Sequence, residues 1–399
     1  MKRTAGSIGM GTGGSQLDGS PQNASSDATD TGAAQSPKPR IVVVGAGFGG
    51  LTAATALRRV EAAVTVIDRC NHHLFQPLLY QVATAALSPA EIAGPIRGIL
   101  SRQANTRVIL GAVTGIDAAA RAVLIGERRI PYDQLIIATG AQDSYFGHDE
   151  WAAVASGLKT IEDATAMRRR ILMAFERAED SDDEAERRRL LTFVIIGGGP
   201  TGVELAGTLA ELARAALARD FRRIDPTTAR IVLIEAEPRL LSGFPPALSA
   251  VAARDLERMG IELRLGVRVT RCDAEGAAHG EDRIESRTLI WAAGVSASPA
   301  ASWLGVEAGH GGRVPVGADL TLPGHPEIFV IGDTALVEGR RGPLPGVAPV
   351  ASKRRSMSPA SSRRVSAAGR CPTRSAIAIS ATSRRSGARP RSSISAGCA

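Results

Sequence analysis

The chain is poor in aromatic residues, in cysteine and in long apolar runs. Only 4% of its 399 residues are Phe, Trp or Tyr, so the core must be built mainly from Ala, Val, Ile and Leu. The four cysteines form no CxxC or CxxxxC pair, which fits a reducing compartment and argues against a dithiol redox enzyme. No segment approaches the roughly 18–20 apolar residues of a membrane span, and no secretory signal is evident.

Acidic residues are missing from one end of the chain. The last 48 residues, 352–399, hold ten Arg and one Lys but no Asp or Glu. Removing these eleven charges from the net charge of +8 leaves −3 for residues 1–351. The excess positive charge therefore belongs to the tail, and we predict no nucleic-acid partner for the mildly acidic body.

The rest of the composition is globular, and the length allows two to three domains. Residues 1–38 are the exception, because they are rich in Gly, Ser, Thr and Asp and have almost no large apolar side chains. Such a segment cannot bury enough surface to offset its ordering entropy, so we predict that it is disordered.

An internal duplication is the most informative feature of the chain. The apolar run 41–44 is typical of a buried parallel strand; it enters a glycine-rich turn, and a helix is predicted over 51–60. A second apolar strand, 64–67, ends in Asp68. The unit is thus strand, glycine turn, helix, strand and acid.

The same unit recurs about 150 residues later. The strand 193–196 enters a second glycine-rich turn, a helix is predicted from residue 203 to about 217, and the strand 231–234 ends in Glu235. A highly charged helix is predicted over 164–190, and its alternating charges predict a solvated face. Three further strands are predicted to end at glycine: 135–137, 289–291 and 328–331.

The first glycine turn has the chemistry of a dinucleotide site. Gly45 allows a sharp turn, Gly47 leaves room for a pyrophosphate against bare backbone, and Gly50 allows close packing of helix on strand. The phosphates would then face the positive end of the helix. Asp68 lies 18 residues after Gly50, where an acid accepts hydrogen bonds from an adenosine ribose.

The second turn repeats this arrangement with Gly197, Gly199 and Gly202, and with Glu235 as the ribose acceptor. A carboxylate there repels a 2′-phosphate, so NADH is favoured over NADPH, although Arg239 is close enough to temper that preference. Two dinucleotide sites in one chain imply two bound dinucleotides. The simplest combination is a flavin dinucleotide in one site and a nicotinamide dinucleotide in the other. Asp333, after Gly332 at a strand end, could hold the flavin's ribityl hydroxyls.

On these motifs the chain resembles the two-dinucleotide flavoprotein reductases, and in particular the type II NADH dehydrogenases, the single-subunit NADH:quinone oxidoreductases. The most specific part is DRCNHHLFQPLLYQVA at 68–83, followed by GGGPTGVELAG at 197–207 and PGVAPVA at 345–351. The resemblance covers residues 39–351 approximately.

The resemblance implies an α/β fold of two Rossmann-like domains, with the NADH domain inserted in a discontinuous FAD domain. The expected FAD domain comprises 39–157 and 299–351, and the expected NADH domain 158–298. NADH would deliver hydride to the flavin, and two electrons would pass to a membrane quinone without proton pumping.

The resemblance also implies site residues. Glu204 matches a family glutamate near the flavin–nicotinamide contact, although an acid in a first helical turn is also favoured by the helix dipole alone. The other residues expected at the cofactors are Gln76, Ala138, Thr139, Gly140, Gly294, Gly332, Asp333 and Ala348, besides the two glycine turns with Asp68 and Glu235.

We expect no metal site. His72 and His73 are expected in a loop after Asp68 with a packing or hydrogen-bonding role, and Cys70 is expected to be inert.

The tail departs from the family, which continues after the PGVAPVA motif into a quinone-site helix and amphipathic membrane-docking helices. Here residues 352–399 are rich in Ser, Arg and Ala, and their apolar residues follow neither the spacing of a helix nor that of a strand. They can be interpreted as an anionic-lipid or nucleic-acid tail, as a solvated disordered tail, or as the product of a reading-frame shift near Lys353. A frame shift would remove the quinone-site helix and the membrane anchor from this chain.

Alternatives to the quinone reductase remain open. A reductase of the same fold could pass electrons to an iron–sulfur protein, and a truncated chain could be an inactive nucleotide-binding protein. By resemblance we expect a cytoplasmic protein, peripheral on the inner face of the cell membrane, or soluble if the anchor is lost. A homodimer is a further expectation.

Overall fold

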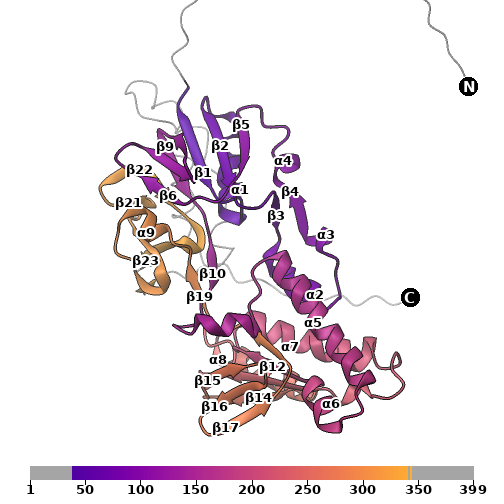
Figure 1. Cartoon of the computed structure of the whole chain (residues 1–399). Helices are drawn as coiled ribbons and strands as arrows, with labels where there is room; N and C mark the ends of the chain where they lie inside the picture. The colour runs from indigo at the N-terminus through magenta and orange to yellow at the C-terminus, as the bar shows by residue number, and fades with distance from the viewer. Residues whose placement is uncertain (1–37, 340–341, 344–399) are drawn as a thin grey trace, which may run out of the picture. The chain divides into compact units, whose positions relative to one another are not determined.

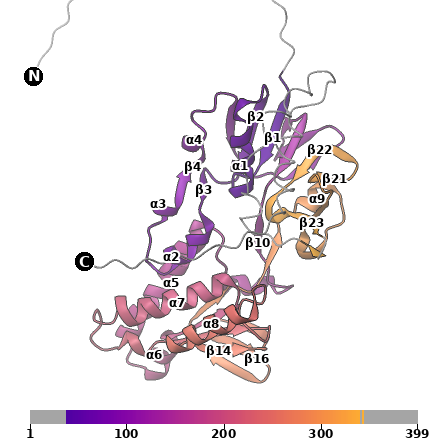
Figure 2. The ribbon, with the colours of Figure 1, turned by 180° about the vertical axis from the view of Figure 1, so that it is seen from behind.

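The computed structural model describes residues 38–339 and 342–343. The predicted disordered segment before Lys38, the basic tail 352–399 and the candidate residue Ala348 lie outside the described residues. Within them the chain forms two parallel sheets, each covered on both faces (Figures 1 and 2).

The first sheet contains the first copy of the duplicated unit. Its strand order is β21-β22-β9-β1-β2-β5, parallel throughout except for the antiparallel edge pair β21 and β22. The strands are β1 (Arg40–Val44), β2 (Ala63–Asp68), β5 (Thr106–Leu110), β9 (Gln134–Ile137), β21 (Thr321–Leu322) and β22 (His325–Val330). β21 and β22 come from the far end of the described chain, so this sheet is discontinuous in sequence.

Both faces of this sheet are buried, which is why 41–44 is continuously apolar. On one face, α1 (Phe48–Ala56) and α4 (Ile96–Ile99) pack near Val43. On the other face, near Val42, lie α9 (Ala300–Leu304) and the antiparallel strands β6 (Gly115–Asp117), β7 (Ala122–Ile125) and β8 (Arg128–Pro131).

The second sheet contains the second copy and is parallel throughout, in the order β11-β18-β12-β13-β14. Its strands are β11 (Ala155–Ser156), β12 (Thr192–Ile196), β13 (Arg230–Glu235), β14 (Glu262–Leu265) and β18 (Thr288–Trp291). One face is covered by α5 (Ile161–Asp180), α7 (Pro200–Glu211) and α2 (Leu79–Ala83); the other by β15 (Val269–Asp273), β16 (Gly276–His279) and β17 (Asp282–Glu285).

Two short two-stranded ladders lie outside the two parallel sheets. β10 (Ala141–Asp143) leaves the first sheet after β9 and pairs antiparallel with β19 (Val295–Ala297), which leaves the second sheet after β18. β3 (His72–Leu74) pairs with β4 (Ala93–Pro95). A small three-stranded sheet has the order β20 (Val314–Val316), β23 (Ala335–Gly339) and β24 (Gly342–Pro343). The other α-helices of the described residues are α3 (Pro89–Ile92), α6 (Glu184–Leu190) and α8 (Pro246–Arg258). Among the helices of the described residues, none has the length and apolarity needed to cross a bilayer.

The prediction of a single solvated helix over 164–190 was wrong. The segment forms two helices, α5 and α6, and α6 is capped by Asp183, whose carboxylate accepts a hydrogen bond from the Ala185 N–H at 2.8 Å. α5 buries an apolar stripe against the second sheet: Ala164, Met167, Ile171, Ala174, Phe175 and Ala178. The stripe has the three- and four-residue spacing of a core-facing helix. The prediction missed it because it relied on the many charged residues between the apolar ones.

The buried face of α5 is testable by a matched pair of truncations. Phe175 is fully buried, with its ring centroid 5.3 Å from that of Phe193, whereas Met173 on the same helix is 40% exposed. We expect Phe175→Ala to lower the free energy of unfolding by about 3–5 kcal/mol because it leaves a cavity, and Met173→Ala by less than about 1 kcal/mol. Urea unfolding followed by circular dichroism measures both, and equal losses would contradict this assignment of the core.

Candidate functional site

The first glycine turn connects the carboxyl end of β1 to α1 at a point where three backbones meet. Gly45 has φ +94°, and a Cβ there would overlap the carbonyl oxygen of Ala138, at the end of the adjacent strand β9. A Cβ on Gly50 would overlap the carbonyl oxygen of Gly45. Both positions therefore require glycine for the close packing of helix on strand.

Gly47 is glycine for a different reason. A Cβ there would meet nothing within 4 Å, and Gly47 caps the amino end of α1, whose Leu51 N–H donates to the Gly47 carbonyl at 3.0 Å. The space beside it thus lies at the positive end of a helix, where unpaired N–H groups favour an anion. This bare backbone fits a pyrophosphate.

The second turn reproduces the first. Gly197 has φ +114°, and a Cβ there would lie 2.5 Å from the carbonyl group of Ala292, at the end of β18. A Cβ on Gly202 would overlap the Gly197 carbonyl oxygen, and one on Gly199 would meet nothing within 4 Å. The duplication seen in the sequence is therefore also a duplication of close contacts.

The acids at the ends of β2 and β13 are held in the same way in both copies. Asp68 accepts hydrogen bonds from the N–H groups of Ala46 (2.6 Å) and Cys70 (2.7 Å). Glu235 accepts them from Gly198 (2.5 Å) and Glu237 (2.8 Å). Each carboxylate oxygen has a further lone pair, so each acid can still accept a ribose hydroxyl.

The Arg239 side chain is bonded to the loop that follows β13. Its guanidinium donates to the carbonyl oxygens of Phe244 (2.9 Å) and Ser242 (2.5 Å) and to the Ser249 hydroxyl (2.6 Å). A weaker contact at 3.3 Å reaches the carbonyl of Leu241. These bonds show that Arg239 organises the loop after β13. Their acceptors are neutral, so the guanidinium keeps its positive charge, and its effect on a 2′-phosphate stays a prediction.

The end of β9 and the turn after β22 form a hydroxyl cluster. The Thr139 hydroxyl lies 2.5 Å from that of Ser298 and 3.2 Å from that of the fully buried Thr334. The Thr334 hydroxyl donates to the Gly140 carbonyl at 3.2 Å. Residues almost 200 positions apart in the sequence therefore lie together here. The cluster places Gly140 and Gly332, with φ of +67° and +71°, and Asp333 at one edge of the first sheet.

The carboxyl groups near this edge are affected by burial. Desolvation raises the pKa of Asp333 and of Asp143, the latter to about 6, while the Lys159 ammonium opposes both shifts. Desolvation also raises the pKa of Glu204, at the start of α7. Asp333 and Glu204 are nevertheless accessible to solvent. Asp333 and Glu204 are therefore accessible carboxyl groups with partly desolvated surroundings, which makes them candidate site residues.

The histidine segment lies in a strand, not in the loop that the sequence suggested. His73, in β3, contacts the Ala46 carbonyl through Nδ1 at 2.9 Å, and its ring packs edge-on against Phe48 at 5.3 Å. The packing and hydrogen-bonding role predicted for His73 is thus what the structure shows. Gln76, just beyond, is exposed in a 3₁₀ turn.

Neither a metal nor a reactive thiol is found near these residues. Within the described part of the chain no group of three or more His, Cys, Asp or Glu could hold a metal ion. Burial and the neighbouring Asp68 carboxylate raise the pKa of the Cys70 thiol, which keeps it protonated and unreactive. Cys70 and Cys272 are both free.

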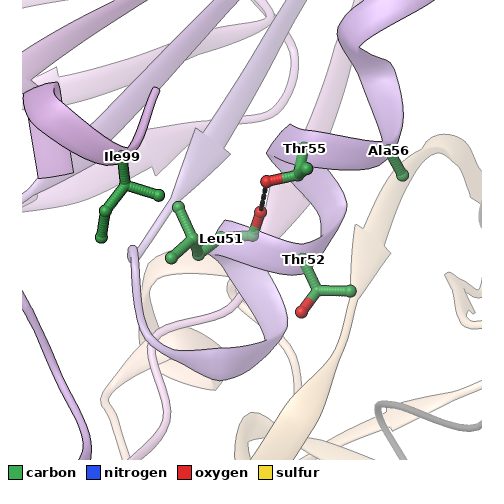
Figure 3. Close-up of a pocket in the computed structure, with 5 residues that line it drawn as sticks. All are labelled: Leu51, Thr52, Thr55, Ala56 and Ile99. Carbon is green, nitrogen blue, oxygen red and sulfur yellow. Dashed lines mark hydrogen bonds between the residues drawn. The ribbon is translucent and has the colours of Figure 1, made fainter. Parts of the chain in front are cut away.

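A surface depression lies on the part of α1 that follows the glycine turn. Leu51, Thr52, Thr55, Ala56 and Ile99 line it, and the Thr55 hydroxyl donates to the Leu51 carbonyl at 2.8 Å (Figure 3). None of these five residues is a predicted cofactor residue. The depression is therefore not the site described above.

Comparison with known proteins gives the family. Residues 39–355 match the pyridine nucleotide-disulphide oxidoreductases. The chain is 50% identical over 323 residues to the type II NADH:quinone oxidoreductase NdhA of Mycobacterium tuberculosis, covering 77% of this chain and 68% of that protein. It is 48% identical over 329 residues to Ndh of the same organism, covering 79% and 70%. This chain belongs to the type II NADH:quinone oxidoreductase family.

Solved structures agree in fold. NDH2 from Plasmodium falciparum in complex with NADH superposes with a TM-score of 0.68 at 23% identity, covering 75% of this chain and 65% of that one. The α/β flavoprotein class and the cofactors FAD and NADH predicted from the sequence are thereby confirmed. Among the described residues, Cys70 and Cys272 are free and lie far apart in sequence.

The space beside Gly199 predicts a selective effect of a single methyl group. A Cβ on Gly199 meets nothing within 4 Å, so the Gly199→Ala variant should fold normally. It should lose NADH affinity by about 10- to 100-fold, because the methyl would occupy the position predicted for the pyrophosphate. Gly207→Ala, in the same helix, is the control and should leave NADH affinity unchanged, since its Cβ makes only ordinary contacts at 3.9 Å. Calorimetric titration with NADH distinguishes them, and normal NADH binding by Gly199→Ala would contradict the assignment.

Asp143 predicts a pH-dependent stability. Its pKa is raised to about 6 in the folded protein by burial, against about 3.9 in an unfolded chain, so folding favours its neutral form. The stabilisation of the folded state by neutral Asp143 is fully present below about pH 4 and is lost as the pH rises through about 6. Asp143→Asn should therefore match the parent's melting temperature at pH 4 and exceed it at pH 7. Asp149→Asn, at an exposed site, is the control; a difference for Asp143→Asn that does not change with pH would contradict the prediction.

Proposed function

We propose that this chain oxidises NADH and passes the electrons through FAD to a quinone. The observation that carries the proposal is the pair of equivalent dinucleotide turns, one on each parallel sheet, whose acids, glycines and neighbouring strand ends make the same contacts. Support for the direction of electron flow comes from the names of relatives that are about half identical to this chain.

The first turn is proposed to hold FAD. Gly47 and the amino end of α1 would face its pyrophosphate, and Asp68 would accept the adenosine ribose hydroxyls. Asp333 would accept hydrogen bonds from the ribityl chain, with Gly332 allowing close approach. Thr139 would position Gly140 through the hydroxyl cluster, with Ala138, Gln76 and Ala348 among the further contacts inferred by resemblance.

The second turn is proposed to hold NADH. Gly199 and the amino end of α7 would face the pyrophosphate, and Glu235 would accept the adenosine ribose hydroxyls. The Glu235 carboxylate would repel a 2′-phosphate, and Arg239, held by its own loop, is expected only to temper that repulsion. NADH is therefore the proposed donor.

Glu204 is proposed to lie beside the reacting groups. When bound, FAD supplies hydride acceptance and two-electron transfer, which no side chain of this protein can provide. Glu204 would orient the nicotinamide and hold or release a proton at its carboxyl group. Its raised pKa favours that role, because a carboxyl that titrates closer to neutrality is a better proton donor and acceptor.

The expectations about the membrane and the tail remain proposals. We infer a peripheral position at the membrane surface, since a quinone acceptor lies in the bilayer, and a homodimer by resemblance. For 352–399 we favour a shifted reading frame near Lys353, because the basic composition begins directly after a family motif. Resequencing the gene across the Val350 codon is the check, and an uninterrupted frame would remove this proposal.

The function is tested on the purified full chain, reconstituted with FAD if needed. We expect a yellow protein whose flavin bands bleach on anaerobic addition of NADH and recover with a soluble quinone. Glu204→Gln should slow bleaching about 10- to 100-fold while NADH affinity changes little, because it removes a proton-carrying group but keeps its shape. Recovery with ferredoxin but not with quinone would favour the iron–sulfur alternative, and a colourless protein that takes up no FAD would defeat the enzyme assignment.

A further inference from the structure

The sheet order defines where the nicotinamide half of NADH must lie, given the proposed NADH site. The adenosine end lies over β13, which ends in Glu235, and the pyrophosphate lies at the turn after β12. The other neighbour of β12 is β18, whose end contacts the turn through Ala292. A dinucleotide laid across this edge therefore extends its second half over the end of β18, at Gly294.

Phe146 lies at this position. A Cβ on Gly294 would overlap its ring at Cζ, so the phenyl group lies directly on the bare backbone at the end of β18. Phe146 is 64% exposed and has φ +54°, a conformation that is unfavourable for a bulky side chain. An exposed aromatic ring held on a strained backbone is not explained by stability, and such outliers cluster at functional sites.

The loop that carries Phe146 is ordered by contacts with β18. The Ser144 N–H donates to the Gly294 carbonyl at 3.1 Å, and the Trp291 indole N–H donates to the Ser144 carbonyl at 2.9 Å. The ring centroid of Phe146 lies 6.2 Å from that of Trp291, with the planes 58° apart. One side of the phenyl group is thus covered by the end of β18, and the rest of its surface is exposed to solvent.

Core packing is carried by neighbouring aromatic residues. Tyr145 and Trp151 are 8% and 6% exposed, and both contact Trp291, with ring centroids 4.9 and 5.7 Å away. Phe146 adds little to this buried group. Its open surface and its position at Gly294 are what distinguish it.

We propose that Phe146 is a positioning residue for NADH, with its phenyl group forming one wall of the nicotinamide subsite. The planar nicotinamide ring packs on the open side of the phenyl group, and Gly294 is glycine because any side chain there would displace the phenyl group. The assignment rests on the proposed NADH site at the second glycine turn, and it concerns only the half of NADH beyond the pyrophosphate.

The test compares two ligands that differ in the nicotinamide ring. In calorimetric titrations of the full chain, Phe146→Gly should weaken NADH about two- to tenfold and leave ADP-ribose unchanged, because a single aromatic contact is removed. Phe146→Tyr should retain parental NADH affinity. Gly294→Ala should reproduce the selective loss by displacing the ring. Leu110→Ala, at another exposed apolar position (58% exposed), is the control and should change neither affinity.

Thermal melting separates positioning from structure. Phe146→Gly should melt no lower than the parent, because glycine accepts φ +54° without strain; a merely structural ring would lower the melting temperature when removed. Unchanged NADH affinity in Phe146→Gly, or equal weakening of NADH and ADP-ribose, would overturn the proposal. Failure of the parent to bind ADP-ribose would instead refute the second glycine turn itself, and with it the proposed function.

Discussion

At the carboxyl end of β1 and again at that of β12, a helix, its own strand and the neighbouring strand approach so closely that no Cβ fits between them. Gly45 and Gly50 meet this constraint in the first copy, and Gly197 and Gly202 in the second. The approach aims the first turn of each helix at the edge of its sheet, where the orphan N–H groups face outward. The cofactor chemistry depends on this backbone contact, since it creates an anion site without any charged side chain.

The two copies differ in what supports the outer side of each turn. In the first, the Ala46 carbonyl is contacted by His73 from the β3–β4 ladder. In the second, the Gly198 carbonyl accepts from the Leu241 N–H at 2.8 Å, in the loop that Arg239 organises. The same turn is therefore supported by a strand ladder in the first copy and by a loop in the second.

Much of this arrangement could be predicted from the sequence because its causes are local. The strand runs, the glycine spacing and the terminal acids each depend on residues within one unit, and the structure has them where expected. The buried stripe of α5 was missed because abundant charge masked its period, and β3 because its partner lies 20 residues on, in β4. The engagement of Arg239 and the stacking of Phe146 on Gly294 depend on loop geometry that no pattern of residue types encodes.

The two-stranded ladder of β10 and β19 connects the proposed FAD site with the proposed NADH site over only a few residues. β10 follows directly on Gly140, which belongs to the proposed flavin edge, and Phe146 comes three residues after β10 ends. β19 begins one residue after Gly294 and ends just before Ser298, whose hydroxyl meets Thr139. Each strand of the ladder thus has one end at the flavin edge and the other at the nicotinamide edge. A shift in ladder register would move both edges at once, so this antiparallel pair, with its three matched residues, would set the alignment of the two proposed cofactor sites for hydride transfer.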